Sequence, residues 1–198
     1  MSDVLHPVEL GADCAADMPG RPETARFSDR QAADDGRLVR AARGGERAAF
    51  AALYDRYARV VHGVLLARVS RDDVEDLVQD VFLAAWRRLD DLRDPAAFGG
   101  WLTMIARNRA TDFHRRSTEF VELPEQLPVR EAATAEMEAR AALDAIRDLP
   151  DAYRETLVLR LVEGLTGPEI ATRTGLTPAS VRVNLHRGMK LLREKLAR

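Results

Sequence analysis

Apolar residues recur at the spacing of an α-helix along most of the chain from Asp34 onward. Residues 46–70 place them on one face, at Phe50, Leu53, Tyr57, Val60, Val61, Val64 and Leu65. Residues 71–92 show the same period most clearly, and it continues in residues 101–117, 134–149 and 151–164. No convincing stretch alternates apolar and polar positions as a β-strand does. The pattern therefore predicts an all-α protein.

Two stretches lack this period. Residues 1–33 contain scattered proline and glycine, and we expect them to form a disordered tail. Residues 117–133 contain two prolines and predict a flexible linker. The chain then divides into two small helical domains, at residues 34–116 and 134–198.

The C-terminal part predicts two helices joined at a glycine. Thr166 and Glu169 have the spacing of a capping box, and Pro168 is compatible with a first helical turn. Gly175 suits the left-handed end of that helix, and Thr177 can cap the next one. Two helices joined by a short turn that contains glycine form a helix-turn-helix.

A helical wheel divides the second of these helices into an apolar and a basic side. The apolar side, which we expect to be buried, consists of Val181, Leu185, Met189, Leu192 and Leu196. The opposite side consists of Arg182, Val183, His186, Arg187 and Lys190. A basic outer face fits a recognition helix in the DNA major groove, where arginine binds guanine edges. The alternative is an amphipathic helix whose basic face is solvated.

The helix predicted from Asp72 to Leu89 has a different outer face. Its core stripe consists of Val74, Leu77, Val78, Val81, Phe82, Ala85 and Leu89. Its outer face carries Asp72, Asp73, Asp76, Gln79 and Asp80, with Leu83 among them. DNA repels such a face, so it is either solvated or docks a basic partner, with Leu83 as an apolar anchor.

The helix predicted over residues 101–117 has a mixed face. Leu102, Ile105, Ala106 and Phe113 form its buried side. A second face carries Trp101, Met104, Asn108, Thr111 and Arg115, flanked by Arg107 and His114. An aromatic ring, an amide, a hydroxyl and a cation together suit unstacked bases and phosphates. The alternative is that Trp101 packs in the core and the arginines are solvated.

Charge is unevenly distributed in a chain whose net charge is −2. Residues 1–35 hold eight acidic residues against three arginines, and residues 72–94 hold the same numbers. Residues 176–198 hold six lysines and arginines against one glutamate. Any nucleic-acid site must therefore be a local patch. The opposite charges also suggest that acidic surfaces cover the basic helix in the free protein.

The sequence gives little indication of a disulfide, a metal site or a catalytic site. The single cysteine, Cys14, excludes an intramolecular disulfide, and no cysteine–histidine cluster has the spacing of a zinc site. We find no nucleophile–base pair or phosphate loop, and we expect neither an enzyme nor a cofactor. No apolar run reaches about 18 residues, so we expect a cytoplasmic protein without membrane insertion.

Three of these segments, in this order, resemble bacterial sigma factors of the sigma-70 family, specifically the extracytoplasmic-function (ECF) group. "DVEDLVQDVFLAAWRRL" is similar to region 2.2, and "FGGWLTMIARNRATDFHRR" to regions 2.3–2.4. The stretch from Leu149 to Leu196 is similar to region 4. The resemblance implies two helical domains, region 2 and region 4, that bind core RNA polymerase and direct initiation at promoters.

The resemblance also implies residue roles. Region 2.2 would bind the clamp helices of the polymerase β′ subunit through Asp76, Gln79, Asp80 and Leu83. Regions 2.3–2.4 would bind and melt the −10 promoter element through Trp101, Asn108, Thr111, Asp112 and Arg115, with the "LRDPAAF" loop as a base pocket. Region 4 would pack on the β flap and bind the −35 element through Ser180, Arg182, Val183, His186 and Arg187, which Lys190 adjoins. An anti-sigma factor is a further implied partner.

The chain departs from the common pattern of this family at Gly167-Pro168 and at Val183-Asn184. The second change lies on or beside the basic face, so a −35 sequence is not transferred from relatives. A stand-alone helix-turn-helix regulator, binding a palindrome as a dimer, is the main alternative. That alternative assigns no function to the acidic helix or to the helix face that carries Trp101.

Overall fold

The computed structural model describes residues 21–119 and 135–197, and within these ranges the chain is helical, with short turns and no strand. The N-terminal bundle consists of α1 (Arg21–Arg43), α2 (Arg47–Leu66), α3 (Arg71–Arg87), the short 3-10 helices η1 (Leu89–Asp91) and η2 (Pro95–Ala97), and α4 (Phe98–Glu119). The C-terminal bundle consists of α5 (Ala135–Arg147), α6 (Asp151–Leu161), α7 (Gly167–Thr174) and α8 (Pro178–Leu196). The all-α prediction is confirmed.

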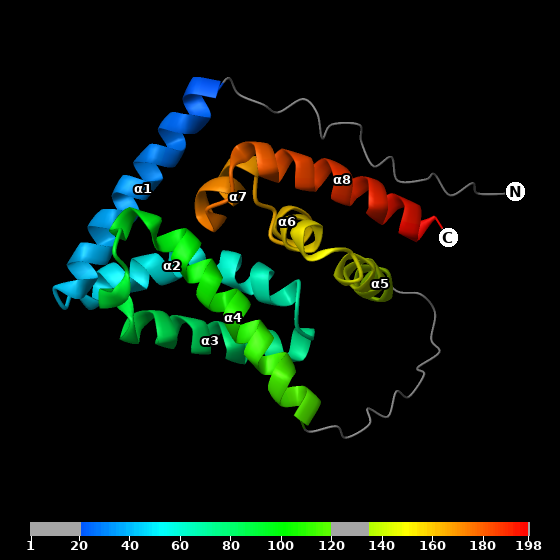
Figure 1. Ribbon diagram of the computed structural model, residues 1–198, viewed down its shortest axis with the longest axis horizontal. Helices are drawn as coiled ribbons and strands as arrows, with labels where there is room; N and C mark the ends of the chain where they lie inside the picture. Colours follow the sequence, from blue (N-terminus) through cyan, green and yellow to red (C-terminus); the bar gives the residue numbers. More distant parts are fainter. Residues whose placement is uncertain (1–20, 120–134, 198) are drawn as a thin grey trace, which may run out of the picture.

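The two bundles correspond to the two predicted domains (Figure 1). Most of the predicted linker, residues 120–134, lies outside the described residues, as do Cys14 and residues 1–20. The domain boundaries at 34, 116 and 134 therefore remain predictions.

The first helix is longer than the sequence suggested. The expected tail ended at residue 33, but α1 begins at Arg21, so the prediction of disorder is wrong for residues 21–33. In that stretch the polar Gln31 is buried, and apolar periodicity does not indicate a buried polar residue. Asp35, just beyond it, is also buried. The Tyr57 hydroxyl donates to Asp35 over 2.5 Å, and Arg56 also pairs with Asp35. Burial raises the pKa of the Asp35 carboxyl despite these partners.

The core of the N-terminal bundle follows the predicted stripes. All seven residues of the stripe predicted on residues 72–89 are buried, six of them on α3 and Leu89 in η1. α2 contributes Leu53, Tyr57, Val60, Val61, Val64 and Leu65. α4 closes the bundle with Phe98, Leu102, Ile105 and Ala106. Phe113 is only partly buried, at the distal end of α4.

The C-terminal bundle packs directly against the N-terminal bundle. α6 contacts α2, and α7 contacts α1, α2 and α4, whereas α3 lies on the far side and contacts no helix of the C-terminal bundle (Figure 1). Arg147 donates to the backbone oxygens of Leu66 (3.0 Å) and Val69 (2.7 Å). The Thr103 hydroxyl lies 3.4 Å from the Thr174 oxygen.

Two buried glutamates of the C-terminal bundle carry the charged part of this contact. Glu155 accepts hydrogen bonds from Arg68 over 2.7 Å and from Arg107 over 2.7 and 3.0 Å. Burial alone would raise the pKa of Glu155, but the two arginines outweigh it and hold that pKa below its ordinary value. Glu163 contacts the His62 ring at 2.6 Å and pairs with Arg59.

We predict that protonation of His62 stabilises the packing of the two bundles. The hydrogen bond to Glu163 raises the pKa of His62 above its ordinary 6.5, against the opposing effect of burial. A raised pKa gives a stabilisation that is complete below the ordinary value and is lost as the pH rises through the raised value. The measurement is an NMR titration of the His62 imidazole in the full chain.

The Glu163→Gln variant should lower the pKa of His62, because it removes the largest cause of the shift. Glu75→Gln is the matched control, since the exposed Glu75 lies 3.8 Å from the other ring nitrogen and should have a smaller effect. Arg71 opposes protonation and is unchanged in both variants. An equal His62 pKa in wild type and Glu163→Gln would contradict the assignment.

Candidate functional site

The outer face of α3 is exposed, as predicted. Asp72, Asp76, Gln79 and Asp80 are exposed, and Leu83 is 52% exposed among them. Asp72 and Asp73 lie in the first turn, where carboxylates interact favourably with the helix dipole, and Ser70 also donates to Asp73. No described residue pairs with Asp76 or Asp80. We call Asp72, Asp76, Gln79, Asp80 and Leu83 the α3 acidic face.

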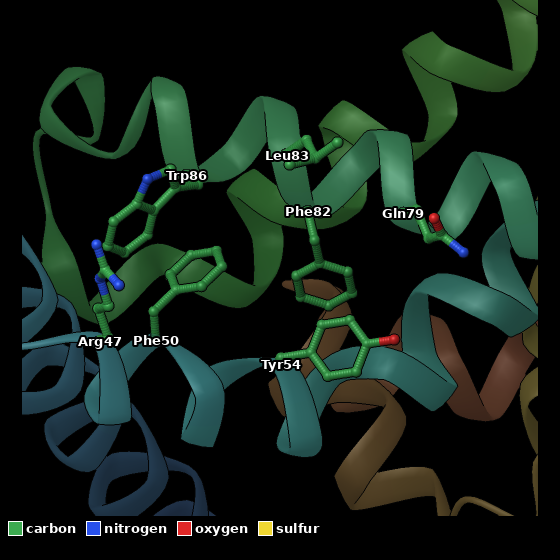
Figure 2. A pocket seen from close by; sticks show the side chains of 7 residues that line it. All are labelled: Arg47, Phe50, Tyr54, Gln79, Phe82, Leu83 and Trp86. Atoms are coloured by element: carbon green, nitrogen blue, oxygen red, sulfur yellow. The ribbon is translucent and has the colours of Figure 1, made fainter.

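An aromatic groove lies beside this face, between α2 and α3 (Figure 2). Phe50 meets Trp86 edge-on with ring centroids 4.7 Å apart, and Tyr54 meets Phe82 at 4.5 Å. The groove has a volume of about 540 Å³, and Gln79, Leu83 and Arg47 complete its lining. Tyr54 and Trp86 are each 40% exposed. The groove thus joins the α3 acidic face to an open aromatic surface.

Sequence analysis found two of the residues that line the groove, Gln79 and Leu83, and missed the aromatic ones. Their signal was present as two aromatic pairs at the i, i+4 spacing, Phe50 with Tyr54 and Phe82 with Trp86. A helical wheel of either helix alone does not show the groove, because the two pairs meet only when α2 and α3 pack together.

The mixed face of α4 is open along most of its length. Asn108, Thr111 and Arg115 are exposed, Met104 is 50% exposed, and Trp101 and Asp112 are partly buried. Trp101 packs against Phe98 with centroids 6.0 Å apart, so the ring is anchored in the core by one side. Arg115 pairs with Asp112 at 3.3 Å, a weak surface contact. Arg107 instead turns toward Glu155.

The "LRDPAAF" loop begins at Leu92, directly after η1, contains η2 and ends at Phe98, the first residue of α4. Arg43 of α1 donates to the backbone oxygens of Leu89 (2.8 and 3.1 Å) and Leu92, which fixes the start of the loop. Asp94 caps η2 by accepting from the Ala96 amide at 3.0 Å. Its role as a base pocket remains a prediction.

The helix-turn-helix is formed as predicted by α7 and α8. Thr166 and Glu169 make a complete capping box, and Gly175 adopts the left-handed conformation with φ 75°. The Thr177 hydroxyl then caps α8 by accepting from the Ser180 amide at 3.1 Å, and it lies 2.8 Å from the Ser180 hydroxyl. Ser180 is thus held at the first turn of α8.

The basic side of α8 faces solvent. Arg182, Val183, His186, Arg187 and Lys190 are all exposed, and we call them the α8 basic face. No acidic surface among the described residues covers it; the acidic residues 1–20 lie outside the described residues, so a role for them in covering the basic helix stays a prediction. Of the apolar side, Val181 and Leu192 are buried and Leu185 and Met189 partly buried.

One apolar position of α8 was predicted wrongly. Leu196 is 56% exposed, because the last turn of α8 lies at the open end of the bundle. Gly188 is buried instead, where a Cβ would lie 3.1 Å from Leu157 and Tyr153 of α6. This glycine lets α6 and α8 approach closely.

The chain matches two family models, Sigma-70 region 2 over residues 53–119 and Sigma-70, region 4 over residues 139–192. The ECF RNA polymerase sigma-E factor of Haemophilus influenzae is 31% identical over 180 residues, which cover 82% of this chain and 95% of the relative. The RNA polymerase sigma factor CarQ of Myxococcus xanthus is 35% identical over 162 residues, covering 78% and 92%. A longer relative, the probable RNA polymerase sigma factor RfaY of Xanthomonas campestris, is 35% identical, and the chain spans 42% of its length.

Solved structures agree with these matches. CnrH, solved in complex with the cytosolic domain of CnrY, gives a TM-score of 0.59 at 28% identity over 83% of this chain and 97% of CnrH. RpoE of Bartonella quintana, solved with the anti-sigma factor NepR, shares the fold with a TM-score of 0.50 at 22% identity.

Two helical bundles, one of which contains a helix-turn-helix with an open basic face, are the architecture of a DNA-binding protein. The chain belongs to the sigma-70 family of RNA polymerase sigma factors, in its ECF group. It therefore carries regions 2 and 4, through which sigma factors direct promoter-specific initiation. No helix of the described residues is long and apolar enough to cross a membrane, and no group of acidic, histidine or cysteine side chains among them could hold a metal.

We predict that Gly175 sets the turn before α8. Alanine in the left-handed region costs about 1–2 kcal/mol, so Gly175→Ala should lower the free energy of unfolding by that amount. Gly175→Asn is the control, because asparagine tolerates this region but adds the same Cβ, 3.3 Å from Gly100 Cα. Chemical denaturation measures both variants. Equal losses would assign the effect to crowding against Gly100 rather than to the backbone.

Proposed function

We propose that three surfaces of this sigma factor have separate binding functions in initiation. The α3 acidic face and the aromatic groove bind the β′ clamp helices of RNA polymerase. The mixed face of α4 binds and melts the −10 element, and the α8 basic face binds the −35 element while region 4 packs on the β flap. The observation that carries the proposal is the charge separation: an open acidic surface, and an open basic surface on a helix-turn-helix, occupy different bundles of one chain.

Polymerase binding fits the first surface for physical reasons. Asp76 and Asp80 repel DNA but attract a basic protein surface. Leu83 and the partly exposed rings of Tyr54 and Trp86 supply an apolar centre, the type of residue that dominates binding energy at interfaces. Because α3 contacts no helix of the C-terminal bundle, this surface is available whatever region 4 binds.

The promoter contacts follow from side-chain chemistry. Trp101 offers part of its ring for stacking, and Asn108, Thr111, Asp112 and Arg115 offer polar contacts along the same helix. Ser180 and Arg182 lie at the N-terminal end of α8, the part of a recognition helix that contacts base edges. His186, Arg187 and Lys190 lie farther along and suit phosphates.

Two further statements follow from this role. Core polymerase is in the cytoplasm, so the protein acts there. We also propose an anti-sigma factor as a regulatory partner, since the structurally similar sigma factor RpoE was solved with the anti-sigma factor NepR, and CnrH was likewise solved with a second protein, CnrY. The direct test is run-off transcription of a fragmented genomic library by core polymerase with and without this protein. New specific start sites support the proposal, and their absence contradicts it.

We predict that Asp80→Lys weakens binding to core polymerase at least about tenfold, because like charges across an interface are costly. Asp80 is exposed and has no described partner, so the fold should be unaffected. Glu138→Lys is the matched control, since it makes the same change on an exposed position of α5. Fluorescence titration with core polymerase measures both variants. Equal affinities for the two would refute the α3 assignment.

We predict different effects for two cations of α8. Arg182→Ala should weaken −35 binding by about 1–3 kcal/mol on the preferred sequence and relax preference at one base pair. Lys190→Ala should weaken binding about equally on all sequences and lower the salt dependence. Holoenzyme binding to promoters with single −35 substitutions distinguishes the two effects. A sequence-independent loss for Arg182→Ala would make it a phosphate contact.

A further inference from the structure

Val183 is an apolar residue in the middle of a basic surface. It is 42% exposed, and the other members of the α8 basic face are Arg182, His186, Arg187 and Lys190. Val183 takes no part in the buried side of α8, which consists of Val181, Gly188 and Leu192. A valine is also a poorer helix former than a lysine or an arginine. Neither packing nor helix formation therefore explains a valine at this position.

The apolar surface around Val183 extends toward the start of α8. Ala179 lies four residues earlier, on the same side of the helix, and is also exposed. His186 and Lys190 continue the same line in the other direction. The outer face of α8 is thus apolar along its centre in the N-terminal half and basic in the C-terminal half. We call Ala179 and Val183 the α8 apolar strip.

The fold holds the α8 apolar strip at the outer surface of the helix-turn-helix. Val181, which is 1% exposed, fixes the rotation of α8, and Val183 lies two residues later on the opposite side. The Thr177 hydroxyl fixes the first turn by accepting from the Ser180 amide at 3.1 Å. Base edges are contacted by the N-terminal part of a recognition helix, which is the part that carries the strip.

The major groove of DNA offers one apolar group to such a strip, the C5-methyl group of thymine. A valine side chain has no hydrogen-bond donor or acceptor, so it gives no favourable contact to the polar edges of guanine, adenine or cytosine. Placed against those edges, it would separate their polar atoms from water without replacing the hydrogen bonds. Placed against a thymine methyl group, it removes two apolar surfaces from water.

The charges around the strip favour DNA over a protein as its partner. A single exposed apolar residue is ordinary and by itself indicates no partner. Here, however, no described residue forms an ion pair with Arg182, Arg187 or Lys190, so the strip lies within open positive charge. On a DNA duplex these cations meet the phosphates that border the groove, while the strip between them faces the bases.

We propose that Val183, with Ala179 beside it, selects thymine at one position of the −35 element by contacting its C5-methyl group in the major groove. The inference rests on the proposed function and deepens it, because it names a base and the residue that distinguishes it. Ala179 contributes by its small size, which lets the first turn of α8 approach the methyl group. The thymine belongs to either strand of the duplex.

Deoxyuridine tests this contact, because it pairs as thymine does and lacks only the C5-methyl group. The probe is the promoter fragment with the strongest start site in run-off transcription. Each thymine of its −35 element, on either strand, is replaced singly by deoxyuridine, and fluorescence titration measures the affinity of the holoenzyme. We expect one replacement to weaken binding about fourfold, which corresponds to the burial of one methyl group.

The Val183→Ala variant links this effect to the residue. Val183 is exposed, so the fold should be unaffected, and the difference between the thymine and deoxyuridine fragments should fall to less than about twofold. Val162→Ala is the matched control, because it makes the same change at a valine that is 49% exposed at the end of α6. That variant should keep the fourfold difference, as should Val183→Ile, which retains a branched apolar side chain.

Three outcomes would contradict these expectations. Equal affinity of the wild-type holoenzyme for all the substituted fragments would overturn the inference and leave −35 binding intact. A fourfold difference that persists in Val183→Ala would also overturn it, because another residue would then contact the methyl group. Binding that no base substitution in the −35 element weakens would instead refute the proposed function of α8, and the inference with it.

Discussion

The carboxylate of Glu155 joins the two halves of this molecule. It is buried on α6, and its charge is balanced by Arg68, just after α2, and by Arg107 on α4. An unpaired carboxylate at this depth would be strongly unfavourable, and removing one partner from a buried pair typically costs about 3–5 kcal/mol. These ion pairs therefore favour one position of region 4 on region 2. The positions of α7 and α8 follow from it.

This arrangement places the exposed surfaces in an order that suits their chemistry. α3 lies on the side of region 2 away from region 4, so its carboxylates are far from the cations of α8 and neither surface neutralises the other. The net charge of −2 is thus a sum of separate patches of opposite sign. Each patch can attract a different macromolecule, which a uniformly charged surface of either sign could not do.

The helices and their ends depend on local patterns in the sequence, and these features were predicted. Apolar spacing located the helices of both bundles, and the capping residues Thr166, Gly175 and Thr177 located the helix-turn-helix. It failed at the start of α1, where the polar Gln31 is buried in the core, because the hydrophobic pattern cannot distinguish a buried polar residue from one on the surface. It failed at Leu196 because burial depends on what lies opposite the end of a helix.

The contact between the bundles was beyond prediction for a related reason. Its key residues are a glycine, two glutamates and several arginines. In a helical sequence a glycine indicates a less stable helix, and charged residues indicate a face exposed to solvent. Only the packing of α6 on α2 gives them partners. The residues proposed to bind DNA and polymerase, in contrast, lie on outer helix faces that a helical wheel resolves. Their exposure was predictable from the sequence for this reason, although the aromatic groove required two helices together.

Apolar and charged groups both contribute to this contact, because the buried apolar side chains of the two bundles form one cluster. An interface made of apolar side chains gains from every Å² it buries, whereas a buried ion pair roughly offsets its own desolvation. Glu155 and Glu163 with their arginines therefore specify the closed geometry more than they stabilise it. The apolar side chains of the shared cluster therefore supply most of the stabilisation, and the buried glutamates determine which arrangement of the two bundles forms.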